Sequence, residues 1–92
     1  MKNYNRLHCR TLLKLAPTDT QAAIVLKERA GSWETCAVGE AAVRVKKSVK
    51  ELKQDTQLFC LGSLFYSKVL FGNYSEATEI YNRIDNLTKD LK

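Results

Sequence analysis

Apolar residues recur at intervals of three and four along most of this chain, which is the spacing of helices with one buried face. The most regular run predicts one amphipathic helix from about Trp33 to Lys53, capped by Ser32. Gly39 inside it indicates a closely packed neighbouring backbone or a nearby break. The predicted inward positions of this helix are Val38, Ala41, Ala42, Val45, Val49 and Leu52.

The next segment is apolar on nearly every side, so it predicts a central, buried helix from Gln57 to Phe71. Asp55 or Thr56 can cap its first amides. Its apolar members are Leu58, Phe59, Leu61, Leu64, Phe65, Val69, Leu70 and Phe71.

A tight turn follows that helix and makes the last two helices a hairpin. Gly72 can take the left-handed conformation that ends a helix, and Asn73 or Ser75 can cap the next one. The last helix is expected from Tyr74 to Leu91. Its predicted inward positions are Ala77, Ile80, Tyr81, Ile84, Leu87 and Leu91.

The N-terminal third predicts two shorter elements. Apolar spacing from Tyr4 to Leu15 favours a helix, although the run around Leu13 also fits a short strand. Pro17 ends that element, and Thr18 or Asp19 caps a helix from Gln21 to Ala30. Residues 1–16 could therefore form a peripheral helix or an arm. The fold expected is a single all-α domain over residues 1–92, a compact bundle of four to five helices with a central apolar helix and a C-terminal helical hairpin.

Composition supports this expectation. The chain has 92 residues, 45% of them hydrophobic and 27% charged, which is typical of a globular domain. One proline and four glycines favour long regular elements. No apolar run reaches the ~20 residues of a membrane span. The three cysteines are widely spaced and odd in number, which predicts reduced thiols and a cytoplasmic protein.

The net charge is +5, and the excess is concentrated in one segment. Its basic residues are Arg44, Lys46, Lys47, Lys50 and Lys53. On a continuous helix, Lys46, Lys50 and Lys53 would share one face. Such a face can be merely solvated, can contact an acidic protein surface, or can contact phosphates. No aromatic residue lies among these lysines, so base stacking is not indicated.

No arrangement of residues indicates catalysis, a cofactor or a metal site. Cys36 lies near a helix start, but the single histidine, His8, is distant in sequence. The His8, Cys9, Cys36 and Cys60 set lacks the short ligand spacing of zinc modules. Glu40 and Arg44 have the spacing of a helical ion pair; alternatively, Glu40 accepts from the Trp33 indole or Arg29. The chain is therefore expected not to be an enzyme.

Two resemblances to known families add to these expectations. Leu61-Gly62, Phe65 and Gly72-x-Tyr74-x-x-Ala77-x-x-x-Tyr81 resemble one tetratricopeptide repeat, without its later proline and without a second copy. This resemblance suggests that Gly62 and Ala77 let the two hairpin helices approach.

The second resemblance is to small uncharacterised proteins of phages and mobile elements. It rests on Trp33-x-x-Cys36-Ala37-x-Gly39-Glu40, followed by Leu61-Gly62-x-x-Phe65 and Ala77-x-x-x-Tyr81-x-x-Ile84. That family implies a phage context and no catalytic residues. We therefore expect a non-enzymatic interaction module. More specifically, we expect an anti-CRISPR-like inhibitor that uses its basic helix face to bind a host defence complex. The alternatives are a small DNA- or RNA-binding regulator using the same lysines and a dimerising module.

Overall fold

The computed structural model describes residues 4–90, and these residues form an all-α fold without strands. This confirms the fold class expected from the sequence, with six α-helices in the described range. A short 3-10 turn, η1 (Tyr4–Arg6), precedes them. The helices are α1 (Cys9–Leu15), α2 (Thr20–Ala30), α3 (Ala37–Val45), α4 (Val49–Lys53), α5 (Thr56–Leu70) and α6 (Tyr74–Thr88).

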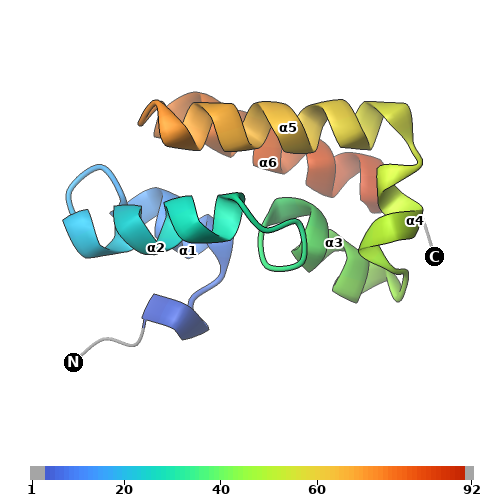
Figure 1. Cartoon of the computed structure of the whole chain (residues 1–92), viewed down its shortest axis with the longest axis horizontal. Helices are drawn as coiled ribbons and strands as arrows, with labels where there is room; N and C mark the ends of the chain where they lie inside the picture. Colours follow the sequence, from blue (N-terminus) through green and yellow to red (C-terminus); the bar gives the residue numbers. More distant parts are fainter. Residues whose placement is uncertain (1–3, 91–92) are drawn as a thin grey trace.

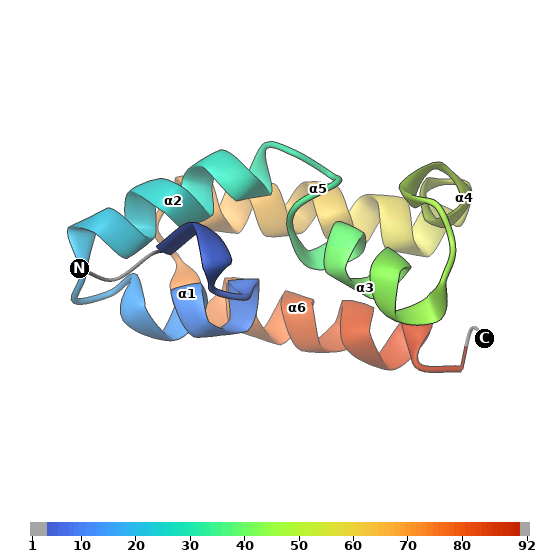
Figure 2. The same ribbon diagram turned by 90° about the horizontal axis from the view of Figure 1, so that it is seen from below.

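The helices are arranged around the hairpin of α5 and α6, which extends along the length of the molecule (Figure 1). A second pair, α1 and α2, packs on one half of this hairpin, so that α2 contacts α5 and α1 contacts α6 (Figure 2). Helix α3 packs on the other half, and α4 links it to α5. The largest fully buried side chains include Phe65, Leu12, Leu26, Leu58, Ile84 and Val69.

The turn between α5 and α6 forms as the sequence predicts. Gly72 has a φ of +75°, the left-handed conformation that glycine adopts without a steric penalty. Asn73 accepts a hydrogen bond from the Glu76 amide at 3.3 Å, and its own side-chain amide donates to the Glu76 carboxylate at 2.7 Å. Lys68 then pairs with Glu76 across the turn at 2.7 Å. The hairpin is confirmed.

The predicted continuous helix from Trp33 to Lys53 is wrong, because the chain turns between Val45 and Val49. Lys46 adopts a left-handed φ of 58°, which ends α3. Ser48 then starts α4 with a reciprocal cap: its hydroxyl accepts from the Glu51 amide at 3.1 Å, and the Glu51 carboxylate accepts from the Ser48 amide at 3.2 Å. The six apolar positions predicted to face inward are nevertheless all buried.

Helix α3 also starts later than predicted. Its N-cap residue is Cys36 and not Ser32, and the chain forms an irregular turn until Ala37. This turn passes so close to α3 that a Cβ atom on Gly39 would lie 2.3 Å from the backbone oxygen of Glu34. The close backbone neighbour inferred from Gly39 is therefore confirmed.

Gly62 on α5 has a different partner from the one expected. A Cβ atom there would lie 2.3 Å from the ring of Trp33, which projects from the turn before α3. Gly62 therefore makes room for an indole ring and not for α6, as the tetratricopeptide-like pattern had suggested. The ring of Phe59 stacks on the same indole, with centroids 5.4 Å apart.

Two expectations about burial need correction. Helix α5 is not buried all round: Phe59, Leu64 and Leu70 are each about half-exposed, while Leu58, Leu61, Phe65 and Val69 face the core. On α6, Leu87 is partly exposed at 37%, and Thr88 is buried in its place. The predicted inward residue Leu91 lies outside the described residues.

The N-terminal helix is an integral part of the core. Cys9, Leu12 and Leu13 of α1 are buried against the neighbouring helices. As expected, Asp19 caps α2, accepting from the Gln21 and Ala22 amides. Within residues 4–90, none of the helices combines the length and apolarity needed to cross a membrane.

Candidate functional site

The basic residues singled out in the sequence lie on three different segments. Arg44 belongs to α3, Lys46 and Lys47 to the turn, and Lys50 and Lys53 to α4. The break at Lys46 therefore removes the single helical face that the sequence predicted. The signal that could have revealed it is Ser48-Val49-Lys50-Glu51, which has the Ser-x-x-Glu pattern of a helix start.

The environments of these basic residues also differ. Arg44 turns toward α6, where its guanidinium lies 2.8 Å from both the Asp85 carboxylate and the Thr88 hydroxyl. The ammonium of Lys53 lies over the Trp33 ring, 4.6 Å from its centroid. Arg44 and Lys53 are thus held by contacts within the fold.

Lys46, Lys47 and Lys50 are the exposed remainder of the basic segment. None of the three forms an ion pair with a carboxylate in residues 4–90. Lys46 and Lys47 border an open hollow of about 510 Å³, together with Arg44, Val45 and Glu51. These three cations are available to an external anion.

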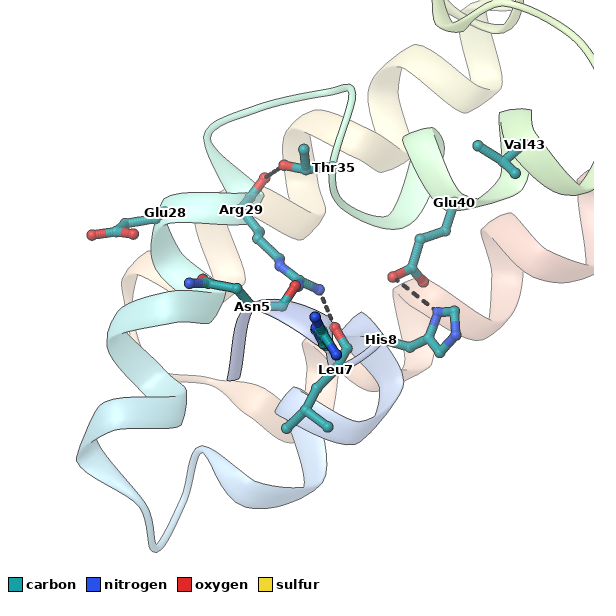
Figure 3. A pocket seen from close by; sticks show the side chains of 9 residues that line it. Asn5, Leu7, His8, Glu28, Arg29, Thr35, Glu40 and Val43 are labelled. Carbon is teal, nitrogen blue, oxygen red and sulfur yellow. Dashed lines mark hydrogen bonds and ion pairs between the residues drawn. The ribbon is translucent and has the colours of Figure 1, made fainter. Parts of the chain in front are cut away.

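A second polar region is centred on Glu40, whose carboxylate joins three segments of the chain. One oxygen accepts the backbone amide of Cys9 at 2.9 Å, and the other accepts the Tyr81 hydroxyl at 2.6 Å. The His8 ring lies 3.6 Å away (Figure 3). We call this set of Glu40, Cys9, Tyr81 and His8 the Glu40 centre. In the described part of the chain, the predicted ion pair between Glu40 and Arg44 does not form, and neither Trp33 nor Arg29 donates to Glu40.

The Glu40 centre borders an open hollow of about 580 Å³ between the N-terminal segment and α3 (Figure 3). Arg29 crosses this region and donates to the backbone oxygens of Asn5 and Leu7. Its own backbone oxygen accepts from the Thr35 hydroxyl at 3.5 Å. These contacts hold the N-terminal turn and the turn before α3 together.

The protonation states in the Glu40 centre favour a structural role. Burial, together with the hydrogen bond to Glu40, raises the pKa of the Tyr81 hydroxyl well above its ordinary value. The contact with Cys36, together with burial, raises the pKa of the Cys9 thiol. Both groups therefore stay protonated at neutral pH, and neither offers an anionic nucleophile. Among residues 4–90, no cluster of three or more His, Cys, Asp and Glu side chains could hold a metal ion.

The outer face of α5 is the third notable region, and sequence reasoning missed it because the helix looked buried on every side. Phe59, Tyr66 and Leu70 lie along one side of the helix, at positions i, i+7 and i+11, and are 45%, 39% and 47% exposed. Leu64 and the C-cap residue Phe71 lie about a third of a turn further round the same solvent side, beyond Ser63 and Ser67, and Phe71 is 86% exposed. We call these five residues the outer α5 face.

One end of the outer α5 face is adjacent to the basic segment. Lys53 covers the Trp33 ring, and Trp33 in turn stacks on Phe59. A cation, an indole and a phenyl ring thus follow one another where α4 meets α5.

No family model, curated protein or solved structure matches this chain.

Proposed function

We propose that this chain is a non-enzymatic protein-interaction module that binds its partner through the outer α5 face. The observation that carries the proposal is the row of exposed aromatic and aliphatic side chains on one helix. Exposed apolar surfaces of this kind often mark binding sites, and aromatic side chains are enriched in the energetically important parts of interfaces.

The partner segment that best complements this surface is an amphipathic helix with acidic residues at one end. Its apolar residues would cover Phe59, Tyr66 and Leu70. Its acidic end would meet Lys50 on α4, since this lysine is exposed and is not paired with a carboxylate in the described chain. The net charge of +5 would further speed association with an acidic partner.

The more specific form of this proposal is an inhibitor of a host defence complex of the anti-CRISPR kind. Its support is the resemblance of the Trp33 to Glu40 motif to small phage proteins. In that form, the outer α5 face would occupy an apolar surface of the complex, and the basic segment would contact an acidic surface beside it.

The experiment places a photo-crosslinking phenylalanine analogue at Phe71 in one tagged chain and at Val43 in another. Val43 is a matched control, because it is 79% exposed and apolar but lies on α3 beside the hollow of Figure 3. After illumination in nuclease-treated bacterial lysate, we expect one protein to be crosslinked from position 71 and not from position 43. Leu70→Gln should reduce its recovery at least tenfold. Equal crosslinking from both positions would contradict the proposal, and so would crosslinking of only a second copy of the chain.

A second candidate is a nucleic-acid-binding regulator, favoured by the exposed Lys46 and Lys47, which border a hollow, and by the exposed Lys50 on the next helix. The test compares Lys46→Gln/Lys47→Gln/Lys50→Gln with a control that changes Lys14, Lys27 and Lys89 to glutamine. Both variants lose three positive charges from exposed sites. If this function holds, only the first variant should lose affinity for a labelled DNA duplex, and its salt slope should fall by about 3. Equal losses would indicate a nonspecific effect of net charge.

A further inference from the structure

Two of the three cysteines lie against each other in the core, although they are 27 residues apart in sequence. Cys9 is the first residue of α1, and Cys36 directly precedes α3. Their side chains are buried, and their sulfur atoms are 2.8 Å apart. We propose that Cys9 and Cys36 form a reversible disulfide within the folded chain. This inference is independent of the proposed function.

The geometry requires little movement for this bond to form. A disulfide has a sulfur–sulfur length of about 2.05 Å, so the two atoms must approach by less than about 1 Å. Two contacts hold the segments around the cysteines beside each other. The Cys9 amide donates to Glu40 on α3 at 2.9 Å, and the Cys9 sulfur lies 3.8 Å from the backbone oxygen of Thr35, the residue before Cys36.

The oxidant belongs to the class of small-molecule disulfides, and glutathione disulfide is a suitable probe of that class. When α1 separates locally from α3, the contact and the burial that keep the Cys9 thiol protonated are lost. One cysteine then gives up its proton to water and attacks the oxidant as a thiolate, forming a mixed disulfide and releasing one thiolate. The other cysteine then attacks the mixed disulfide, closes the Cys9–Cys36 bond and releases the second thiolate. Two protein S–H bonds are lost and one S–S bond forms, so two protons and two electrons leave the protein and the oxidant becomes two thiols.

The surroundings of the pair determine how this exchange begins. Both sulfurs are buried, so the first attack takes place when α1 separates locally from α3. The hollow described above is lined by His8 and Thr35, the residues that directly precede Cys9 and Cys36. Once closed, the bond joins α1 to α3 and removes conformations from the unfolded chain, which stabilises the fold.

Cys60 provides the internal comparison. It is exposed on α5, and no sulfur partner lies beside it in the described chain. The experiment therefore uses Cys60→Ser as its starting protein, which keeps the Cys9 and Cys36 pair and prevents disulfides between molecules. The folded protein and a urea-unfolded sample are each incubated with glutathione disulfide and then analysed by intact mass and tryptic mapping.

For the folded protein, we expect a mass loss of about 2 Da, corresponding to two hydrogens. Trypsin should release residues 7–10 joined to residues 30–44. The melting temperature should rise by roughly 10 °C and return after treatment with dithiothreitol. Further replacement with Cys36→Ala should abolish both the mass loss and the shift in melting temperature.

The proposal is overturned if the folded protein keeps two free thiols under conditions that oxidise the unfolded sample. It is also overturned if glutathione adducts accumulate on both cysteines instead of the linked peptides. Because the mapping is done with both cysteines present, its result does not depend on whether Cys36→Ala folds.

Discussion

Folded proteins usually bury apolar side chains and expose charged ones, and the Glu40 centre and the outer α5 face depart from this rule in opposite directions. The first places a carboxylate among packed helices, and the second places aromatic and aliphatic side chains in solvent. At the Glu40 centre, the departure is compensated within the chain, because the carboxylate accepts from both Tyr81 and Cys9. On the outer α5 face, no other helix of the described chain covers the exposed parts of the aromatic and aliphatic side chains. An irregularity that the fold itself satisfies indicates architecture, whereas one that it leaves unsatisfied points outward, to a partner.

The strongest test of this contrast is Glu40→Ala. It leaves the Tyr81 hydroxyl and the Cys9 amide without their acceptor, and each loss costs about 1–3 kcal/mol. We expect the free energy of unfolding, measured by urea titration, to fall by about 3 kcal/mol. Glu79→Ala on the exposed side of α6 is the control and should change it by less than about 0.5 kcal/mol. Similar effects of the two variants would show that the Glu40 centre does not hold the helices together.

Gly62→Ala tests the boundary between the core and the outer α5 face. The added methyl group would collide with the Trp33 ring, and overpacking of this kind costs about 1–3 kcal/mol. Because Trp33 is the single tryptophan, its displacement should be visible as a red shift of the fluorescence emission. Gly31→Ala is the control, since its nearest neighbours would lie at 3.6 Å. An unchanged spectrum for Gly62→Ala would mean that the indole does not occupy this position.

Alkaline pH should weaken the Glu40 centre. Tyr81 and Cys9 have pKa values raised by folding, so each stabilises the fold fully below its unfolded pKa and loses that contribution as pH rises. With unfolded values of about 10 for tyrosine and 8.5 for cysteine, stability should decline from about pH 8.5 upward.

Tyr81→Phe isolates the tyrosine part of this effect. At pH 7 the variant should be about 1–2 kcal/mol less stable than the natural chain, because one hydrogen bond is lost. Above pH 10 the difference should narrow, since phenylalanine does not titrate. Urea titrations at pH 7, 9 and 10.5 would measure it. A difference that stays constant with pH would argue against the hydrogen bond to Glu40.

Lys46→Gly should have the smallest effect and the opposite sign. Lys46 holds a left-handed φ of 58° that glycine adopts more easily, so the variant should gain about 0.5–1 kcal/mol in unfolding free energy. Lys47→Gly is the control and should bring no gain. A gain in stability would show that the fold does not require the lysine side chain at this position. That is the property that we also assign to the side chains of the outer α5 face. A loss of stability would instead give the lysine side chain a structural role.

Much of the fold could be predicted because its signals are local. Gly72 and Asn73 mark the hairpin turn, and Asp19 and Asp55 cap the helices that follow them. The break near Lys46 was missed because the three-and-four spacing of valines and alanines continues through it. Apolar spacing reports which residues face inward, but it does not report whether the backbone between them stays helical.

The two functional regions were harder to predict for different reasons. The Glu40 centre depends on tertiary contacts with residues 31 and 41 positions away in sequence, which no local pattern encodes. The outer α5 face was hidden because its apolar residues look the same in sequence as those of the core. The packing of α2, α3, α4 and α6 on α5 determines which side of this helix remains uncovered.

The contact between α1 and α6 has a consequence for how the molecule forms during synthesis. The first helix packs on the last one, so α1 has no complete binding surface until the ribosome has released the residues of α6. Until then α1 has its contacts with α2 but not those with α6. The core between the first and the last of these helices therefore closes only after α6 has left the ribosome.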